Sequence, residues 1–491
     1  MNDQKNEHLV IFSNREPYSH VHTQRGIEIH RPASGLVSAL EPVLREFGGL
    51  WIAHGSGSAD AETCDQNGML AVPPEDPRYQ LKRVWLSPSE RRSYYDGFSN
   101  EGLWPLFHLA HHEPTFRRTD WESYTKVNER FAQSLSDREL EGASSILVQD
   151  FHLALVPRFL RSRLPKDNVT QKIALTWHIP WIPAEIFRIC PWSTEILEGM
   201  LGADLITFHT ASYCLNFLEC CERLLECRVD REKSTITLRG AQTRVIAAPI
   251  GIDPPPLQPR SNQELRQALL SKFGIAPEIL GLGVDRLDYT KGIPQRLLAI
   301  ERFLEQYPSF LGRFSFLQIA SPSRTEVPAY RRFALSVEAE TKRINEKFQN
   351  ILRDSDLDHS ESRYRRCPPI HLVTENQDWE CLGDLYRSAD VCIVSSLHDG
   401  MNLVAKEYVW TKTNLKGALL LSKFTGASQE LREAFLFNPY DQDESARAIY
   451  ASLIATEEDL KERMTKMHAR VASRDSKAWA DEIITSLREP A

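Results

Sequence analysis

Two cations lie close together in residues 285–292, "DRLDYTKG", directly after an apolar run. Arg286 offers a fixed planar fork of donors and Lys291 a compact point charge, and both suit a diphosphate whose leaving charge must be stabilised. The alternative is a solvated charged loop in which Asp285 and Asp288 pair with these cations. The spacing alone leaves both interpretations open.

A second candidate segment is "SSLHDGMNLVAKE", residues 395–407, in which an apolar run ends at a tight turn and a helical pattern restarts from Met401. The start of a helix leaves backbone N–H groups without partners, which makes it a ready anion site. We therefore expect residues 402–404 to face a phosphate and Glu407 to accept hydrogen bonds from a ribose diol. In the alternative, Asp399 only caps the helix and Glu407 is a surface acid.

The other candidates share one position, because each follows a predicted strand. Open parallel sheets bind ligands beyond the carboxyl ends of their strands. The residues found there are Ser13, Asn14, Arg15, Asp150, His152, His178 and Arg324.

Four competing sites have weaker support. The "GLGVDR" segment lacks the third glycine of a dinucleotide fingerprint, so a nicotinamide oxidoreductase is weakly supported, and the chain has no G-x-x-x-x-G-K-[ST] phosphate loop. His108, His111 and His112 have no HExxH partner, and we expect structural roles for them. The cysteines at positions 214, 220, 221 and 227 contain no CxxC pair, which favours helix packing over a metal site.

Short apolar runs alternate with helical patterns along the whole chain, which predicts an α/β fold with parallel sheets covered on both faces. At 491 residues the chain is too long for one ordinary core. The proline-rich residues 251–263 mark a boundary between two doubly wound domains, 1–253 and 254–465, with the active site expected in the cleft between them. An amphipathic helix within residues 466–491 is expected to pack back on the first domain.

Composition narrows the class of protein. Hydrophobic residues make up 42% and charged residues 26%, as in ordinary globular proteins, and the net charge of -8 argues against broad nucleic-acid binding. The N-terminal residues lack the pattern of a signal peptide, and no apolar run is long enough to cross a bilayer. Nine cysteines without secretory spacing predict reduced thiols in the cytoplasm.

A series of motifs resembles one family. "SNR", "YYDGFSNEGLWP", "VQDFH", "HIPWIPAEIF", "DRLDYTKG", "SPSR", "AYRR" and "HDGMNLVAKE" occur in the order and approximate spacing of the trehalose-6-phosphate synthases, glycosyltransferase family 20. The resemblance runs from Leu9 to the C-terminal helix. It implies a retaining glucosyltransferase of GT-B architecture, built from two Rossmann-like domains.

The resemblance also implies a nucleotide-sugar donor, UDP-glucose in most of the family, bound largely on the second domain. The positions that match its donor site are Gly35, Arg286, Lys291, Asp399, Asn402, Leu403 and Glu407. Arg286 and Lys291 would hold the diphosphate, Asp399 would contact the glucose, and the helix start with Glu407 would hold phosphate and ribose. His178 would lie near the reacting glucose, which makes the implied catalytic set His178, Arg286, Lys291 and Asp399.

The implied acceptor is glucose 6-phosphate, giving trehalose 6-phosphate with retention by a front-side route in which the diphosphate leaves and helps to deprotonate the acceptor. The positions that match the acceptor site are Arg15, His54, Tyr95, Trp104, Asp150 and Arg324. Arg15 and Arg324 suit a phosphate, whereas Tyr95 and Trp104 suit a sugar face, with ordinary core packing as the alternative for these two aromatics.

Two departures from the family pattern bear on these assignments. Ser34 replaces the first of two glycines in the loop "PASGLVSAL", and His54 stands where the family has a tryptophan in the acceptor pocket. Related synthases use glycerol 3-phosphate, and "NREPY" resembles theirs, although "FSNEGLWP" and "GMNLVAKE" resemble the trehalose branch. A non-catalytic sugar-phosphate-binding regulator and an inert relative are further alternatives.

The expected partners are small molecules, UDP-glucose and a sugar or polyol phosphate, with no nucleic acid and no membrane. The sequence leaves homo-oligomerisation open. No metal motif is apparent, so we expect no metal ion or other cofactor to be required, with Arg286, Lys291 and the helix start supplying the charge stabilisation.

Overall fold

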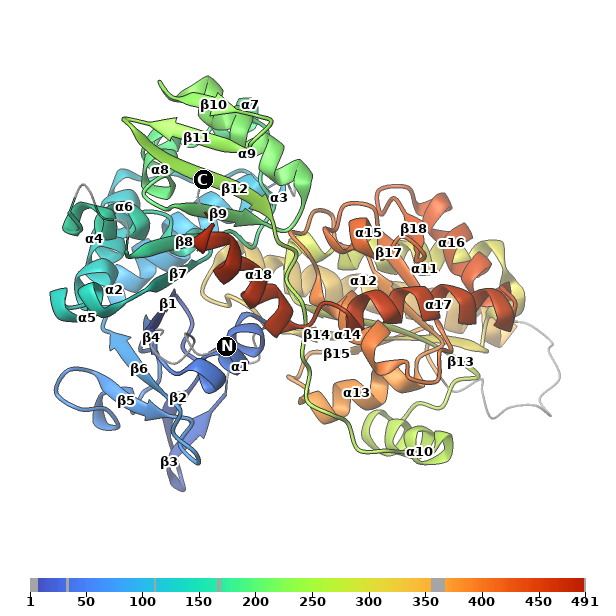
Figure 1. Cartoon of the computed structure of the whole chain (residues 1–491). Coiled ribbons are helices and arrows are strands. Elements are labelled where there is room, and N and C mark those ends of the chain that lie inside the picture. The colour runs from blue at the N-terminus through green and yellow to red at the C-terminus, as the bar shows by residue number, and fades with distance from the viewer. Residues whose placement is uncertain are drawn as a thin grey trace. The chain divides into compact units, whose positions relative to one another are not determined.

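The computed structural model describes residues 8–31, 35–109, 112–165, 168, 170–354 and 367–489, so Ser34 and His111 lie outside the described residues (Figure 1). The chain forms two compact units. The first contains residues 1–253 and 474–491, and the second contains residues 254–473.

The first unit is built on a ten-stranded sheet in the order β10-β11-β12-β9-β8-β7-β1-β4-β6-β5. The parallel strands are β1 (Leu9–Ser13), β4 (Leu50–His54), β6 (Tyr79–Val84), β7 (Ser145–Gln149), β8 (Lys172–Thr176), β9 (Leu205–Phe208) and β12 (Ala241–Ala247). Antiparallel strands β5 (Met69–Val72), β10 (Arg228–Asp230) and β11 (Thr235–Leu238) extend its two edges. The strand order reverses between β1 and β7, which is the switch point of this doubly wound sheet.

Helices cover this sheet, and one hairpin, β2 (Ser19–Thr23) with β3 (Gly26–His30), stands apart from it. The α-helices are α1 (Gly35–Phe47), α2 (Pro88–Arg91), α3 (Trp104–His108), α4 (Arg118–Ser134), α5 (Asp137–Gly142), α6 (Val156–Arg163), α7 (Ala184–Phe187), α8 (Ser193–Met200), α9 (Ala211–Leu224) and α18 (Ser476–Arg488). Shorter turns are η2 (Asp60–Glu62) and η4 (Phe151–Leu153), and η3 (Arg92–Leu103) is a π-helix between α2 and α3.

The C-terminal helix α18 packs against α1 and β8 and buries Trp479, Ile483 and Leu487. The Nε1 of Trp479 donates a hydrogen bond of 3.2 Å to the carbonyl of Ala248, which fixes the helix to the end of β12. The expected boundary at residue 465 falls inside helix α17 (Glu457–Ala472), which belongs entirely to the second unit. The return to the first unit comes at 473/474 because α17 is continuous and packs on α14.

The second unit has a six-stranded parallel sheet in the order β15-β14-β13-β16-β17-β18. Its strands are β13 (Ile279–Arg286), β14 (Phe314–Ser321), β15 (Ile370–Val373), β16 (Val391–Val394), β17 (Ala418–Ser422) and β18 (Phe435–Phe437). In chain order this is 3-2-1-4-5-6, the Rossmann arrangement, with its switch point between β13 and β16.

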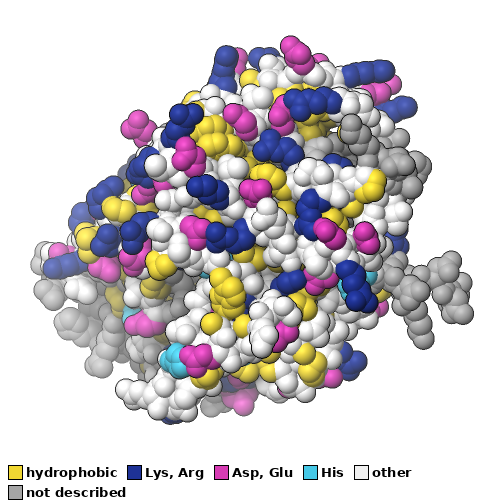
Figure 2. Space-filling model, turned by 90° about the vertical axis from the view of Figure 1, so that its left-hand side faces the viewer, with side chains coloured by type: hydrophobic (Ala, Val, Ile, Leu, Met, Phe, Trp, Pro, Cys, Tyr) yellow, Lys and Arg dark blue, Asp and Glu magenta, His cyan; other side chains and the backbone are white. Residues whose placement is uncertain are grey.

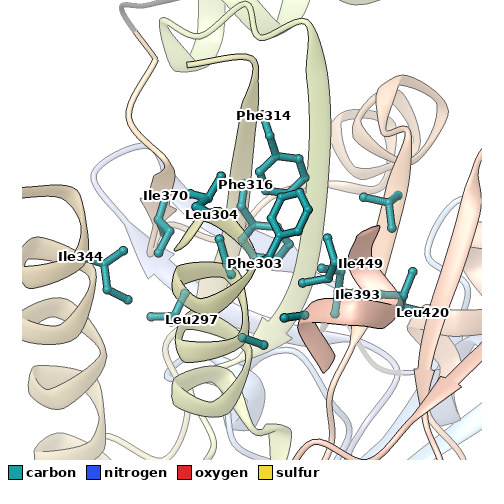
Figure 3. Close-up of a cluster of buried hydrophobic side chains, with 14 of the residues drawn as sticks. Leu297, Phe303, Leu304, Phe314, Phe316, Ile344, Ile370, Ile393, Leu420 and Ile449 are labelled. Carbon is teal, nitrogen blue, oxygen red and sulfur yellow. The ribbon is translucent and has the colours of Figure 1, made fainter. Parts of the chain in front are cut away.

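The helices of the second unit are α10 (Asn262–Phe273), α11 (Ile293–Gln306), α12 (Pro328–Asp354), α13 (Trp379–Ser388), α14 (Leu403–Thr411), α15 (Ala427–Glu430), α16 (Gln442–Ile454) and α17, with short turns η5 (Tyr289–Lys291) and η6 (Pro308–Phe310). One core cluster, between α11 and the sheet, joins Leu297 and Phe303 of α11 to Phe316 of β14 and Ile393 of β16 (Figure 3). Each such buried side chain contributes about 1.5–3 kcal/mol. This packing explains why the strands are unbroken apolar runs, and it fixes where their carboxyl ends lie.

The molecular surface carries charges of both signs. On the face in Figure 2, Lys and Arg side chains are interspersed with Asp and Glu. None of the described helices has the length and apolarity needed to cross a membrane.

Candidate active site

The switch point of the second unit brings the two predicted donor segments together. Lys291 follows β13 and Asp399 follows β16, and the Nζ of Lys291 donates a hydrogen bond of 2.5 Å to Oδ2 of Asp399. The side chains are only 14% and 13% exposed, so this is a largely buried ion pair. The two segments therefore form one site.

Asp399 is held by more than its cation. Ser396 Oγ and Asn402 Nδ2 donate to the same Oδ2, at 3.1 and 3.2 Å. The main chain of Asp399 is also fixed, since its N–H donates to the carbonyl of Phe424 and its carbonyl accepts from Gly426. The position of this carboxylate is thus set by contacts within the protein.

Helix α14 begins at Leu403 rather than at the predicted Met401, and its N-cap is Asn402, not Asp399. Asn402 has a φ of 81° and its Oδ1 accepts a hydrogen bond of 3.1 Å from the N–H of Ala405. The helix starts later because the preceding chain is occupied in fixing Asp399. The N–H groups of the first turn remain at the end of β16, where the sequence predicts an anion site.

Glu407 lies one turn into α14 and is half-buried, so the alternative of a surface acid is wrong. Tyr386, fully buried in α13, donates a hydrogen bond of 2.9 Å to Oε2 of Glu407. Burial raises the pKa of Glu407, and the hydrogen bond from Tyr386 opposes that rise. Glu407, which is predicted to contact ribose, is therefore positioned by a hydrogen bond from the hydroxyl of Tyr386.

Arg286 and Arg324 share the buried carboxylate of Asp288. Arg324 Nη1 donates to Asp288 Oδ2 at 2.9 Å, whereas Arg286 Nη2 lies 3.9 Å from that oxygen. Burial alone would raise the pKa of Asp288, but Arg324, Arg286 and Lys291 lower it below its usual range. Arg286 remains 36% exposed, and Arg324 only 5%. Arg324 belongs to the second unit, whereas the other five predicted acceptor residues belong to the first.

Arg296, on α11, is a central residue of this site that the sequence motifs did not single out. Its buried guanidinium donates to Asp285 Oδ2 at 2.6 Å, Gln318 Oε1 at 2.7 Å and Ser395 Oγ at 2.9 Å, which joins the ends of β13, β14 and β16. Asp285 therefore makes its ion pair with Arg296 and not within the charged loop. The feature of the sequence that could have identified Arg296 is its position on the apolar face of the helical pattern that became α11.

The switch point of the first unit lies between β1 and β7, and Asp150 follows β7. Asp150 has a φ of 72°, and its Oδ1 accepts hydrogen bonds from the N–H groups of Phe151 at 2.9 Å and His178 at 3.2 Å. The His178 ring lies between Gln149 Oε1, 2.9 Å from Nε2, and His209 Nε2, 3.2 Å from Nδ1. Burial and then His209 hold the pKa of His178 well below its usual range. His178 is therefore a neutral, oriented imidazole at neutral pH.

A cavity of about 320 Å³ opens at the ends of β1 and β4 in the first unit. We call it the β1/β4 cavity. Its described lining residues are Asn14, Arg15, Glu16, Ser19, His30, His54, Ser56, Arg91 and Tyr95. It brings together three predicted acceptor residues, Arg15, His54 and Tyr95. Burial and then the charge of Arg91 lower the pKa of His54 to about 4, so His54 is neutral near pH 7.

The two predicted aromatics differ in their surroundings. Tyr95 lines the β1/β4 cavity and stacks on His152, with ring centroids 5.5 Å apart and planes 12° apart. Trp104 is 6% exposed and packs on His108 and Phe151, at 4.0 and 5.9 Å between centroids. Tyr95 therefore presents its ring to the cavity wall, and Trp104 makes the core contacts that the alternative interpretation expects.

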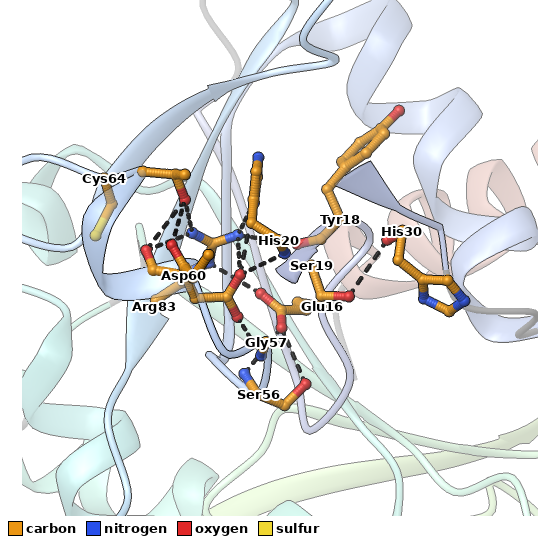
Figure 4. A network of polar contacts seen from close by, with 12 residues as sticks. Glu16, Tyr18, Ser19, His20, His30, Ser56, Gly57, Asp60, Cys64 and Arg83 are labelled. Carbon is orange, nitrogen blue, oxygen red and sulfur yellow. Dashed lines mark hydrogen bonds and ion pairs between the residues drawn. The ribbon is translucent and has the colours of Figure 1, made fainter. Parts of the chain in front are cut away.

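A buried polar network that the sequence analysis missed forms the wall behind this cavity (Figure 4). Arg83 Nε donates to Glu16 Oε2 at 2.9 Å, and Arg83 Nη2 lies 2.9 Å from Asp60 Oδ1. Glu16 Oε1 also accepts from the N–H and Oγ of Ser56, at 2.9 and 3.0 Å. Burial and the hydrogen bond with Asp60 raise the pKa of Glu16 to about 8. Two carboxylates share one guanidinium, so Glu16 carries a proton near neutral pH.

One histidine and three cysteines of the two predicted clusters have structural roles, and His112 is exposed. His108 is buried, and its Nδ1 lies 2.8 Å from the carbonyl of Trp104. Cys214, Cys220 and Cys221 are buried in α9, and all nine cysteines are free thiols. The predicted helix packing is confirmed for these three cysteines, whereas Cys227 lies beyond the end of α9 and is half-buried. Among the described residues, no three His, Cys, Asp or Glu side chains are placed to hold a metal ion.

The fold and these two switch points define a doubly wound α/β protein with cationic and acidic side chains gathered at strand ends, a class whose ligands bind beyond the carboxyl ends of the strands. A model of glycosyltransferase family 20 matches residues 7–489. The trehalose-6-phosphate synthase of Mycolicibacterium gilvum is 37% identical, over 98% of this chain and 94% of that protein.

Two solved structures resemble the chain along its whole length. One, from E. coli and bound with UDP-2-fluoro glucose, has a TM-score of 0.81 at 30% identity and covers 99% of this chain and 100% of that one. The alpha,alpha-trehalose-phosphate synthase (UDP-forming) from Burkholderia xenovorans, in complex with glucose-6-phosphate, has a TM-score of 0.80 at 30% identity, over 98% and 100% of the two chains. The chain belongs to glycosyltransferase family 20. The predicted class, two Rossmann-like doubly wound domains of the GT-B type, is confirmed.

Proposed function

We propose that this protein transfers glucose from UDP-glucose to glucose 6-phosphate with retention of anomeric configuration, forming trehalose 6-phosphate and UDP. The observation that carries the proposal is the Lys291–Asp399 pair at the switch point of the second unit, next to the start of α14. The relatives support it, since one is named a trehalose-6-phosphate synthase and two solved structures contain a UDP-glucose analogue and glucose-6-phosphate.

On the donor side, Arg286, Lys291 and the first turn of α14 would bind the diphosphate. Glu407, oriented by Tyr386, would accept hydrogen bonds from the ribose, next to Asn402 and Leu403. Asp399 would hold the glucose hydroxyls, and Gly35, the first residue of α1, would belong to the donor loop. Arg286 and Lys291 would together stabilise the charge that develops as UDP leaves.

In the chemical step, the bond between the anomeric carbon and the diphosphate oxygen breaks, and the acceptor hydroxyl attacks the same face. The proton of that hydroxyl passes to the departing diphosphate oxygen, so no protein carboxylate becomes a nucleophile. The neutral His178, held by Gln149 and His209, would lie near the reacting glucose. The cations Arg286 and Lys291 would do the work that a metal ion does in other transferases.

On the acceptor side, Arg15, His54, Tyr95, Trp104, Asp150 and Arg324 remain the proposed residues. A second candidate acceptor is glycerol 3-phosphate, which is favoured by one observation. His54, a small neutral side chain, lines the β1/β4 cavity where the family pattern has a tryptophan. We also propose a cytoplasmic location, which the free state of all nine cysteines supports.

The test is UDP release by the purified protein with UDP-glucose and, in turn, glucose 6-phosphate, glycerol 3-phosphate or no acceptor. The products are identified by mass spectrometry, and each assay is repeated with excess chelator. Trehalose 6-phosphate formed in the presence of chelator is the expected product. Transfer only to glycerol 3-phosphate would replace the acceptor, and binding of either sugar phosphate without turnover would make the protein a regulator.

A further inference from the structure

We propose that Arg91 is a phosphate-binding residue of the β1/β4 cavity, acting with Arg15 to select acceptors that carry a phosphomonoester. The inference rests on the proposed function and deepens it, because it assigns a specificity-determining residue that the family motifs do not contain. Both guanidiniums line the same cavity in the first unit. They come from different elements, Arg15 from the loop after β1 and Arg91 from the end of α2.

The backbone of Arg91 is anchored. Helix α2 begins with a capping box in which Ser87 Oγ accepts from the N–H of Glu90 and Glu90 Oε2 accepts from the N–H of Ser87. Arg130 of α4 then grips Glu90, with Nη2 donating to Oε1 at 2.5 Å and Nη1 to Oε2 at 3.1 Å. Helix α2 is thus fixed both at its N-cap, Ser87, and at Glu90. The side chain of Arg91 therefore extends from a backbone of defined position.

The guanidinium of Arg91 is oriented but still accessible. Its Nη2 lies 3.3 Å from Asp96 Oδ2, on the following π-helix, and the Arg91 side chain is 41% exposed. An arginine has five donors, and a single carboxylate at this distance engages one edge of the fork. The side chain can therefore offer another edge to an anion in the cavity.

The remaining cavity wall does not compete for that anion. Glu16 is the one carboxylate among the described lining residues, and it is turned toward Arg83 and Ser56 and protonated near neutral pH. His54 is uncharged. Arg15 and Arg91 thus make the net charge of the cavity lining positive. Two guanidiniums match the charge and the geometry of a phosphomonoester dianion.

Arg324 is a poorer source of that charge. It belongs to the second unit, is 5% exposed, and is bound to the buried carboxylate of Asp288 at 2.9 Å. Its positive charge is balanced within its own unit. Arg15 and Arg91, of which Arg91 is paired along one edge, therefore supply counter-charge for the phosphate from the first unit, in addition to the proposed contact with Arg324.

The experiment compares Arg91→Ala and Arg91→Lys with Arg92→Ala, which removes the adjacent, exposed arginine. KM is measured for glucose 6-phosphate, for unphosphorylated glucose and for UDP-glucose. For Arg91→Ala we expect KM for glucose 6-phosphate to rise roughly ten- to a hundredfold, with no change for glucose or UDP-glucose. Arg91→Lys should lie between, and Arg92→Ala should match the wild type.

Equal losses with glucose 6-phosphate and glucose, or no loss at all, would overturn the assignment. Direct binding of glucose 6-phosphate and glycerol 3-phosphate, measured by calorimetry on the same variants, separates this inference from the proposed function. If the wild type binds a sugar phosphate without transferring glucose, the proposed function fails, and weaker binding by Arg91→Ala still supports the role of Arg91. If the wild type binds neither phosphomonoester, the assignment is overturned as well.

Discussion

The Nζ of Lys291 and the Oδ2 of Asp399 are 2.5 Å apart at the switch point of the second unit, and three donors converge on that one oxygen. The pair joins the loop after β13 to the turn after β16, two segments separated by more than a hundred residues of sequence. The cation that we propose for the diphosphate is thus paired with a carboxylate of the protein. This arrangement keeps a buried charge satisfied.

Substitutions in the Lys291–Asp399 pair should change the free energy of unfolding and kcat by different amounts. Lys291→Ala leaves the carboxylate of Asp399 buried without its cation, so we expect a loss of about 3 kcal/mol in the free energy of unfolding. We also expect kcat to fall roughly 100- to 1,000-fold, because the leaving diphosphate loses its point charge. Lys291→Ala combined with Asp399→Asn should regain most of the stability and none of the activity. Denaturant unfolding and steady-state kinetics measure the two quantities, and near-normal turnover in Lys291→Ala would refute its role.

The half-exposed Arg286 predicts a different outcome. Its contact with Asp288 is long, 3.9 Å, so Arg286→Ala should leave the free energy of unfolding within about 1 kcal/mol of the wild type. The same substitution should lower kcat by roughly 100-fold or more. Lys342→Ala, an exposed cation on α12, is the control, and it should alter neither quantity. A large loss of stability in Arg286→Ala would show that the residue is structural.

Tyr386→Phe tests the proposal that the carboxyl group of Glu407 binds ribose. The substitution removes the 2.9 Å hydrogen bond to Glu407 and leaves the ring packing unchanged. We expect KM for UDP-glucose to rise by about tenfold, the cost of one hydrogen bond, with KM for the sugar-phosphate acceptor unaffected. Tyr408→Phe is the matched control, since Tyr408 is also fully buried but its hydroxyl contacts the main chain, at 3.5 Å from the carbonyl of Ala389, and not Glu407. Equal effects of the two substitutions would argue against a specific role for Tyr386.

His54 should make the protein less stable in mild acid. Its pKa is about 4 in the folded protein, because burial and then Arg91 disfavour the charged ring, against an ordinary value near 6.5. Between these values the unfolded chain binds the proton and the folded protein does not, so stability falls as the pH drops from about 6.5 toward 4. His54→Gln should remove that part of the pH dependence. Thermal unfolding of both proteins from pH 4 to 8 gives the difference, which should grow in favour of the variant below pH 6.

Glu16 should contribute with the opposite sign. Its pKa is raised to about 8 in the folded protein, so the favourable protonated form is fully present at low pH and is lost as the pH rises from about 4.5 through 8. Glu16→Gln keeps the shape of the protonated acid and cannot ionise. The stability of this variant relative to the wild type should therefore increase from pH 5 to pH 9. A constant difference across this range would mean that Glu16 is ionised beside Arg83.

The fold could be predicted well where the strands are buried on both faces. The runs "ILGLGVD" and "DVCIVSS" are β13 and β16, because parallel strands covered by helices on both sides read as continuous apolar segments. The antiparallel edge strands β5, β10 and β11 are partly exposed and carry no such run. The predicted start of α14 was two residues early because the side chain of Asn402, rather than the apolar pattern, decides where that helix begins.

The residues of the candidate site also fall into two groups, those that local sequence predicts and those that it does not. Lys291, Asp399 and Asn402 could be predicted to meet because each follows a strand at the switch point. The roles of Arg296 and Arg83 could not be predicted, because the sequence pattern suggests that an arginine in a helix or a strand is exposed. The structure shows both side chains buried, each between two acidic or amide partners. Long-range partners of this kind depend on packing rather than on local sequence.

The return of the chain to the first unit has a consequence for how the protein is made. Gly251 lies against the main chain of Arg474 and Asp475, where a Cβ would come within 2.3 Å of a carbonyl, so the chain leaves and re-enters the first unit at one place. On the ribosome, Trp479, Ile483 and Leu487 emerge only after the whole of the second unit. Until then the surfaces of α1 and β8 that α18 covers remain exposed to water. The unit that is synthesised first is therefore the one that completes its folding last.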